Sequence, residues 1–220
     1  MRARHSPFPP YWWATALSDA GVESRPRVGT YGKYEYADLP PVPFPMSGDL
    51  AWLEAQPVHD EWTINGNADD RLPELLAACD RAGLELPPAF TRFMESPPLQ
   101  ERVRSCTGCY IDLDAAPVKA PSGGHLVRFL ADQQGCLFWY LHLTEGGADH
   151  AVVCSPDFHG TEADEAPAGP DEISFAAETF ETFICRFWLE NEIWYAAAEG
   201  AHSEVGLEYV QRYRNGGNAR

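Results

Sequence analysis

The feature that most constrains the fold is a change in the spacing of apolar residues, from a helical period to a strand-like period and back. Residues 69–83 carry apolar side chains at helical spacing. From about Cys109 the spacing becomes alternating, over the runs CYIDLD, GHLVRFLAD, CLFWYLHLTE and HAVVCS. At Thr179 the helical period returns, over TFETFICRFWLENEIWYAAA. Short, turn-rich joints between the alternating runs favour antiparallel neighbours over parallel strands with crossover helices.

We therefore expect an α+β domain with an antiparallel β-meander of four to six strands, EISFAA being an additional strand, and helices on one face. The run CLFWYLHLTE is apolar on both alternating faces, which predicts a central strand. Asp69 or Asp70 is expected to cap the first helix and Gly83 to end it, while Thr179 is expected to cap the last long helix. The predicted core contact joins that helix to the central strand through Trp139, Phe183, Phe187 and Trp188.

Three regions are predicted along the 220 residues. Residues 1–68 hold nine of the 19 prolines and many aromatic residues, which predicts an irregular extension packed on the main domain. Residues 69–198 form that domain. Residues 199–220 predict a short helix, SEVGLEYVQRYR, and a frayed tail.

The charge is strongly acidic, with 16 Lys and Arg against 33 Asp and Glu and a net charge of −17. Such a charge argues against nucleic acid or an anionic membrane as the main partner. Residues 129–185 hold eleven acids and no Lys or Arg. We interpret this stretch as a docking surface for a cationic protein, the alternative being a solvated face that serves solubility alone. The predicted binding residues are Asp132, Glu145, Asp149, Asp157, Glu162, Asp164 and Glu165.

The cellular compartment is predicted from the N-terminal segment and from the cysteines. The N-terminus begins basic, but its apolar part, residues 11–17, is short and follows three prolines, so an export signal is not predicted. No run approaches the length of a transmembrane helix. Four of the six cysteines lie in apolar runs, as buried free thiols do. The prediction is a cytoplasmic protein with reduced cysteines.

Few residues are candidates for catalysis or for metal binding. Cys106 and Cys109 form a CxxC pair without a second pair to complete a zinc site, so we expect no metal and no cofactor. Asp112 and Asp114 alternate onto one strand face, as a catalytic carboxylate pair or as a solvated edge. The Cys154 and His159 region is the alternative for an uncharacterised enzyme, with a nucleophile and a base.

Three motifs resemble the SMI1/KNR4 (SUKH) superfamily. LELPPAF at 84–90 is similar to the family's G-x-x-L-P-x-x-Y/F link between two helices. DQQGCLFWYL at 132–141 is similar to its central hairpin with a tryptophan, and AETFETFI at 177–184 to its A-x-S-F-x-x-F-L entry into the last helix. The resemblance covers residues 71–198, lacks the family's Asn-Gly after the second helix, and leaves residues 1–68 without a counterpart.

The resemblance implies protein binding rather than catalysis. Bacterial members of the superfamily are often immunity proteins that block toxins, commonly nucleases, and fungal members are scaffolds in cell-wall signalling. It therefore implies an immunity protein against a basic, nuclease-like toxin, with a cytoplasmic scaffold that has no toxin partner as the alternative. An inhibitor of a cationic nuclease gains from negative charge, because electrostatic attraction speeds association.

Overall fold

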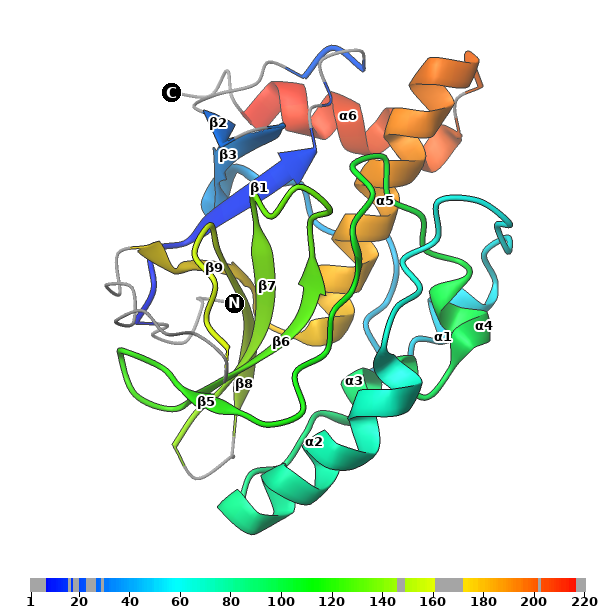
Figure 1. Cartoon of the computed structure of the whole chain (residues 1–220). Coiled ribbons are helices and arrows are strands. Elements are labelled where there is room, and N and C mark those ends of the chain that lie inside the picture. The colour runs from blue at the N-terminus through cyan, green and yellow to red at the C-terminus, as the bar shows by residue number, and fades with distance from the viewer. Residues whose placement is uncertain are drawn as a thin grey trace.

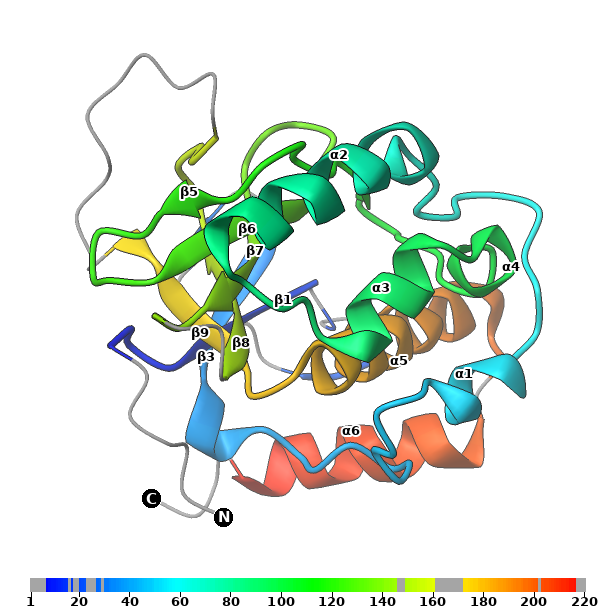
Figure 2. The same cartoon turned by 90° about the horizontal axis from the view of Figure 1, so that it is seen from below.

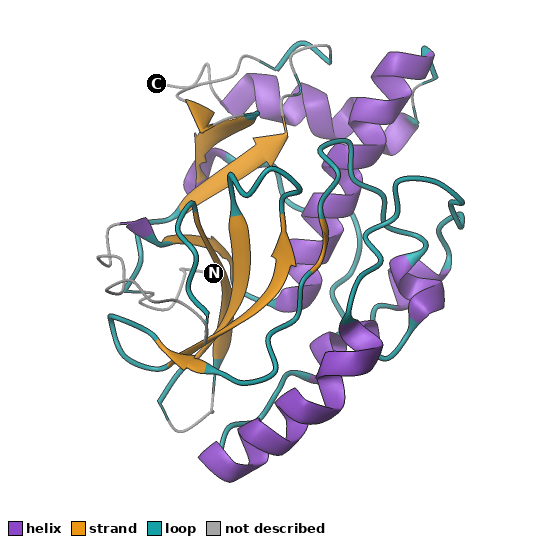
Figure 3. Cartoon of the chain, viewed as in Figure 1, coloured by secondary structure: helices purple, strands orange, loops and turns teal. Residues whose placement is uncertain are grey.

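The computed structural model describes residues 7–15, 17, 20–22, 27, 28, 30–145, 149–160, 172–201 and 203–216. Within these residues the fold is α+β, as predicted, with two antiparallel sheets and the helices gathered on one side (Figures 1 and 3). No helix in this part of the chain has the length and apolarity needed to cross a membrane.

The larger sheet has six strands in the order β4-β6-β7-β8-β9, with β5 also paired to β6. Its strands are β4 (Tyr110–Ile111), β5 (Val118–Lys119), β6 (His125–Ala131), β7 (Phe138–Leu143), β8 (His150–Ser155) and β9 (Ser174–Ala177). All pairings in it are antiparallel, and β7 lies in the middle as expected. The short strand β5 was not predicted from the sequence.

The longest helix packs directly against one face of this sheet, and two other helices pack on that helix. The helices are α1 (Ala51–Glu54), α2 (Ala68–Ala82), α3 (Pro88–Met94), α4 (Pro97–Gln100), α5 (Phe180–Glu199) and α6 (Glu204–Gly216). Viewed from below, α3 lies in front of α5, whereas α2 lies next to β6 (Figure 2). Gly83 ends α2 in the left-handed conformation, as expected, but Asn67 precedes the helix in place of Asp69 or Asp70 and makes no side-chain cap.

The start of α5 follows from its sequence. Thr179 Oγ1 accepts a hydrogen bond of 3.0 Å from the backbone N–H of Thr182, which is the predicted N-cap. Glu181 lies in the first turn of the same helix. It is buried and accepts hydrogen bonds from the backbone N–H groups of Gly48 and Leu50, at 2.6 and 3.0 Å. One acid therefore joins the long helix to the turn before α1.

The core prediction is right for three of its four aromatic residues. The ring of Trp139 lies 6.2 Å from that of Phe183 and 6.1 Å from that of Phe187, and all three are buried. Trp188 is also buried, but it packs against Trp52 and Phe44 at 5.6 and 5.8 Å. Trp188 faces the N-terminal region because it follows Phe187 by one residue, or about 100° around the helix.

The N-terminal region is less irregular than expected. It forms a second sheet in the order β1-β3-β2, from β1 (Tyr11–Thr15), β2 (Arg27–Val28) and β3 (Tyr31–Glu35), followed by the 3-10 turn Tyr36–Asp38. A backbone hydrogen bond of 2.9 Å from Phe175 to Pro9 joins this region to β9, the edge of the larger sheet. Trp12, Tyr31 and Leu50 belong to the same continuous core as the main domain.

The second face of the larger sheet is covered by this N-terminal region rather than by a helix. Phe8 lies edge-on against His142 at 5.1 Å, and Tyr36 against Phe175 at 5.1 Å. Tyr140, Val153 and Phe175 lie in this smaller core, which explains why β7 is apolar on both faces.

Candidate functional site

Asp132 does not lie on an exposed acidic surface, so the sequence prediction is wrong for this residue. Its side chain is 3% exposed. Its Oδ2 accepts a hydrogen bond of 2.8 Å from Tyr31 Oη, and its Oδ1 accepts one of 2.9 Å from the backbone N–H of Gln134. Asp132 therefore holds the β6–β7 turn against the N-terminal sheet.

The other predicted binding residues do not gather into one patch. Glu145 and Asp149 are exposed where the connection between β7 and β8 begins and ends. Asp157 is exposed beyond the opposite end of the same two strands, whose two ends are about 17 Å apart at roughly 3.3 Å per residue. Glu162, Asp164 and Glu165 lie outside the described residues.

Asp112 and Asp114 form ion pairs with a buried arginine. Arg128 Nε lies 2.8 Å from Asp112 Oδ2, and its Nη2 lies 3.0 Å from Asp114 Oδ1. The Arg128 guanidinium also lies 4.2 Å from the centre of the Phe158 ring. The two carboxylates are engaged in holding Arg128 next to the sheet, and Asp114, at 6% exposed, is not on a solvated edge.

The CxxC pair lies inside a hydrogen-bonded loop. Cys109 is buried, with its Sγ 3.3 Å from both Tyr31 Oη and Thr107 Oγ1. Burial raises the pKa of Cys106 to about 12, so its thiol is protonated at neutral pH. All six cysteines are free thiols, and the described part of the chain has no group of three His, Cys, Asp or Glu side chains arranged to hold a metal ion.

The structure does not bring Cys154 and His159 together. Cys154 is buried in the core between the sheet and α5, and burial raises the pKa of its thiol far above the usual value. His159 Nε2 instead lies 3.3 Å from Ser155 Oγ, and its backbone N–H donates to Tyr140 Oη at 3.0 Å. Cys154 and Ser155 point to opposite faces of β8, since successive strand residues alternate.

A surface loop that the sequence analysis did not single out presents an exposed tryptophan. We call residues 57–62 the Trp62 loop. Trp62 is 62% exposed and Val58 54% exposed, although most aromatic residues of this protein are buried. Trp62 also has a φ of 60°, a left-handed conformation that a bulky residue rarely adopts. The loop belongs to no helix or strand, so its apolar residues show no periodic spacing that could have pointed to it.

The Trp62 loop is fastened to the domain by its backbone. The N–H of His59 donates to Glu101 O at 2.8 Å, and Trp62 O accepts from the N–H of Ser105 at 2.9 Å. Thr63 then forms an isolated bridge with Arg104. The exposed indole is therefore carried on a backbone with defined partners on both sides.

The Trp62 loop carries two exposed carboxylates, and the two arginines beside it already have partners, Arg102 through its Nη1 donating to Gln56 O. Asp60 and Glu61 are exposed. Arg104 donates to both carboxylate oxygens of Glu192 at 2.9 Å and lies 3.8 Å from the centre of the Tyr195 ring. Burial lowers the pKa of His59, although the nearby Glu192 opposes this shift, so the imidazole adds little positive charge at neutral pH.

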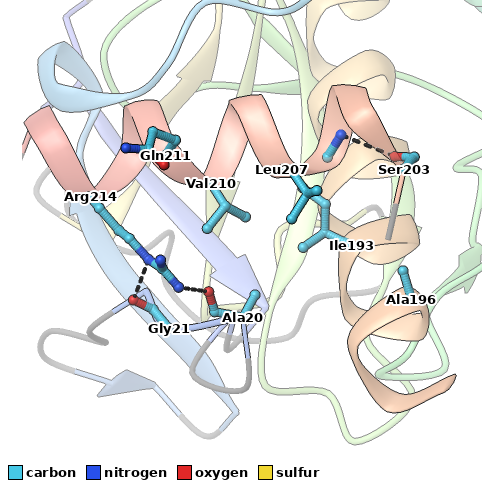
Figure 4. Close-up of a pocket in the computed structure, with 10 residues that line it drawn as sticks. Ala20, Gly21, Ile193, Ala196, Ser203, Leu207, Val210, Gln211 and Arg214 are labelled. Carbon is cyan, nitrogen blue, oxygen red and sulfur yellow. Dashed lines mark hydrogen bonds between the residues drawn. The ribbon is translucent and has the colours of Figure 1, made fainter. Parts of the chain in front are cut away.

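A pocket of about 470 Å³ lies between α5, α6 and the turn at Ala20 and Gly21 (Figure 4). Its apolar lining comes from Ile193 of α5 and from Leu207 and Val210 of α6. At one end Arg214 Nε donates to Gly21 O at 3.0 Å, and its Nη2 donates to Ala20 O. Gly21 has a φ of 77°, a backbone conformation that favours glycine, and a Cβ there would displace the Arg214 guanidinium.

A buried polar network holds α6 on α5 beside this pocket. Glu190 accepts hydrogen bonds of 2.8 Å from Trp12 Nε1 and from Tyr209 Oη. Arg186 Nη1 donates to Tyr209 Oη at 2.7 Å and to Pro40 O at 2.8 Å. Burial raises the pKa of Glu190 to about 7, against the opposing effect of Arg186. The network joins four segments of the chain and is enclosed, so its role is structural.

Comparison of the chain with protein-family models, curated proteins and solved structures finds no match.

Proposed function

We propose that this protein is a non-catalytic protein-binding module of the SMI1/KNR4 type, with a cationic protein as its partner. The family assignment is supported by the three sequence motifs alone. The observation that carries the binding role is the Trp62 loop, which presents an exposed indole and two exposed carboxylates on an anchored backbone.

The exposed tryptophan favours a binding surface. Tryptophan is enriched among the residues that dominate protein–protein affinity, because it buries a large area with little loss of conformational freedom. Trp62 is held in an unfavourable backbone conformation with most of its ring in water. A left-handed non-glycine residue costs on the order of 1–3 kcal/mol, and a side chain that is 62% exposed gains little burial to offset that cost.

The charge around Trp62 favours a cationic partner. A Lys or Arg side chain stacked on the indole would gain a cation–π interaction, and Asp60 and Glu61 would neutralise it. The net charge of −17 would also speed encounter with a basic protein. Glu145, Asp149 and Asp157 lie at two separated ends of the sheet. We assign them to this long-range attraction and not to direct contact.

An immunity protein acting on a basic, nuclease-like toxin is the specific form of this proposal, in a cytoplasmic setting. A cytoplasmic scaffold with no toxin partner is the second form. The two are distinguished by the neighbouring genes, since an adjacent toxin gene favours immunity. The enzyme alternative gains no support from the described residues, in which Cys154 and His159 have separate partners.

The experiment uses affinity capture from cells of the source organism with the full chain, followed by identification of the retained protein and measurement of its association rate. Trp62→Ala is compared with Tyr110→Ala, because Tyr110 is another exposed aromatic residue, 42% exposed, on β4. Trp62→Ala should weaken binding by roughly tenfold or more, and Tyr110→Ala should not.

Charge reversal tests the cationic character of the partner. Asp60→Lys with Glu61→Lys should slow association and also speed dissociation. Asp149→Lys with Asp157→Lys should change only the salt-dependent association rate. Glu85→Lys with Glu95→Lys is the matched control for total charge. A partner whose binding is unaffected by the substitutions in the Trp62 loop would refute the proposed surface, and a captured protein that is acidic would refute the charge argument.

A further inference from the structure

The pocket between α5 and α6 has the composition of a site for a small amphipathic anion. Its volume of about 470 Å³ lies within the range of roughly 300–1,000 Å³ that is common for small-molecule sites. Ile193, Leu207 and Val210 form its apolar wall, and Leu207 is 54% exposed at the surface. Leu207 therefore supplies the apolar area that the protein leaves in contact with water, whereas Ile193 and Val210 are only 5% and 7% exposed.

The described residues that line the pocket carry a positive charge, in contrast to the molecule as a whole. Of the ten described residues that line it, Arg214 alone is charged. Arg214 donates to two neutral carbonyl oxygens, of Gly21 and Ala20, and the described residues include no carboxylate ion-paired with it. By contrast Arg212, two residues earlier on α6, pairs with Glu208. A guanidinium has five N–H groups, so Arg214 keeps donors for a ligand.

The acids of α6 do not compete for this arginine from within the pocket. Glu204 and Glu208 lie one turn apart on α6 and are not among the lining residues. Leu207 and Arg214 lie on the pocket side, seven residues or about 10 Å apart along the helix. The apolar wall and the cation thus lie in line along α6, as Figure 4 shows.

We propose that this pocket binds a medium-chain monocarboxylate, with the carboxylate on Arg214 and the hydrocarbon chain along Val210 and Leu207 towards Ile193. The proposal is independent of protein binding through the Trp62 loop. An uncharged molecule of the same length would leave the Arg214 charge without a partner, and a short acid would leave the apolar wall in water. Selectivity for the combination of both groups follows from these two requirements.

The test measures binding of octanoate, 1-octanol and acetate to the full chain, by calorimetry and by methyl NMR shifts of Ile193, Leu207 and Val210. Octanoate should bind roughly tenfold or more tightly than 1-octanol, because 1-octanol cannot form the hydrogen-bonded charge pair with Arg214. Acetate should bind more weakly than either, because it has no hydrocarbon chain to cover the apolar wall. This comparison uses the unaltered protein. Equal binding of octanoate and 1-octanol, or no binding of octanoate, would overturn the proposal.

Two variants locate the site. Arg214→Gln should remove the preference for octanoate over 1-octanol, whereas Arg212→Gln, on the same helix outside the pocket, should keep it. Ala196→Trp should fill the pocket and weaken octanoate roughly tenfold without touching Arg214. Octanoate binding that survives both Arg214→Gln and Ala196→Trp, in variants with unchanged circular dichroism, would place the ligand elsewhere and refute the site.

Discussion

Tyr209 of α6 donates a hydrogen bond of 2.8 Å to Oε1 of Glu190 in α5, and both side chains are buried. Trp12 of β1 donates to the other carboxylate oxygen, so a single acid connects three elements that are distant in the sequence. Arg186 is the buried cation of the same network. The attachment of the C-terminal helix therefore involves one buried carboxyl group and one buried hydroxyl group.

The first prediction concerns pH. The folded pKa of Glu190 is raised to about 7, above its ordinary value, so the folded state holds a proton that the unfolded state releases. Glu190 therefore contributes stability that is fully present below the unfolded pKa and is lost as pH rises through about 7. The loss should be on the order of 3 kcal/mol. Urea unfolding at several pH values should show it in the wild type, and Glu190→Gln should flatten this part of the profile. An unchanged profile in Glu190→Gln would assign the effect to other groups.

The second prediction compares two tyrosines of α6. Tyr209→Phe removes a hydroxyl that serves both Glu190 and Arg186, and it should destabilise the protein by about 1–3 kcal/mol. Tyr213 Oη is buried without a hydrogen-bond partner among the described residues, so Tyr213→Phe should be neutral or slightly stabilising. Denaturant midpoints measure both. Equal losses in the two variants would contradict the assigned network.

The spacing of apolar residues and the helix-capping residues predicted the main helices and strands, because both signals depend on residues close together in the sequence. The alternating runs became β6, β7 and β8, and Thr179 caps α5, since burial of alternating side chains and N-capping each depend on a few neighbouring residues. The strand β1 was missed. Its sequence YWWAT follows a run of prolines that argues against regular structure, and only its pairing with β3 makes it a strand.

The site residues were harder to predict because their roles depend on distant partners. In the sequence Asp132 is one of many acids in an acidic stretch. Its hydrogen-bond partner Tyr31 is 101 residues earlier, so nothing near Asp132 indicates that it is buried. Trp62 lies in an irregular loop, where neither hydrophobic period nor charge indicates whether the indole is covered. The pocket depends on Gly21 and Arg214, which are near opposite ends of the chain. Only tertiary structure brings such pairs together.

The third prediction tests the packing of α5 on the central strand. Phe187 is 4% exposed and contacts Trp139 and Phe183, so Phe187→Ala should cost about 3–5 kcal/mol through lost burial and a cavity. Leu207→Ala is the control, since Leu207 is 54% exposed and should change stability little. Thermal unfolding followed by circular dichroism measures both. An unchanged melting temperature in Phe187→Ala would show that α5 does not pack as described.

The fourth prediction separates structural from surface acids. Asp132→Asn weakens the hydrogen bonds from Tyr31 and from the β6–β7 turn, so it should destabilise the protein by about 1–3 kcal/mol. Glu145→Gln should have an effect within about 0.5 kcal/mol, because its side chain is exposed. Chemical denaturation of both variants gives the comparison. If Asp132→Asn were as stable as Glu145→Gln, the hydrogen bonds assigned to the buried Asp132 would not contribute to stability.

The last prediction concerns the thiols, and it bears on the enzyme alternative. A catalytic cysteine needs an accessible thiolate, whereas Cys154 is fully enclosed and burial raises the pKa of its thiol. Cys136, in the turn before β7, is partly exposed. In the native protein, iodoacetamide should therefore alkylate Cys136 first. Cys154 should react only as fast as the protein unfolds, and mass spectrometry of samples taken over time would show both rates. In urea the two should react at similar rates, because the enclosure is lost. Rapid alkylation of Cys154 in the native state, with a pH dependence near neutrality, would instead indicate an activated nucleophile and would return the enzyme alternative to consideration.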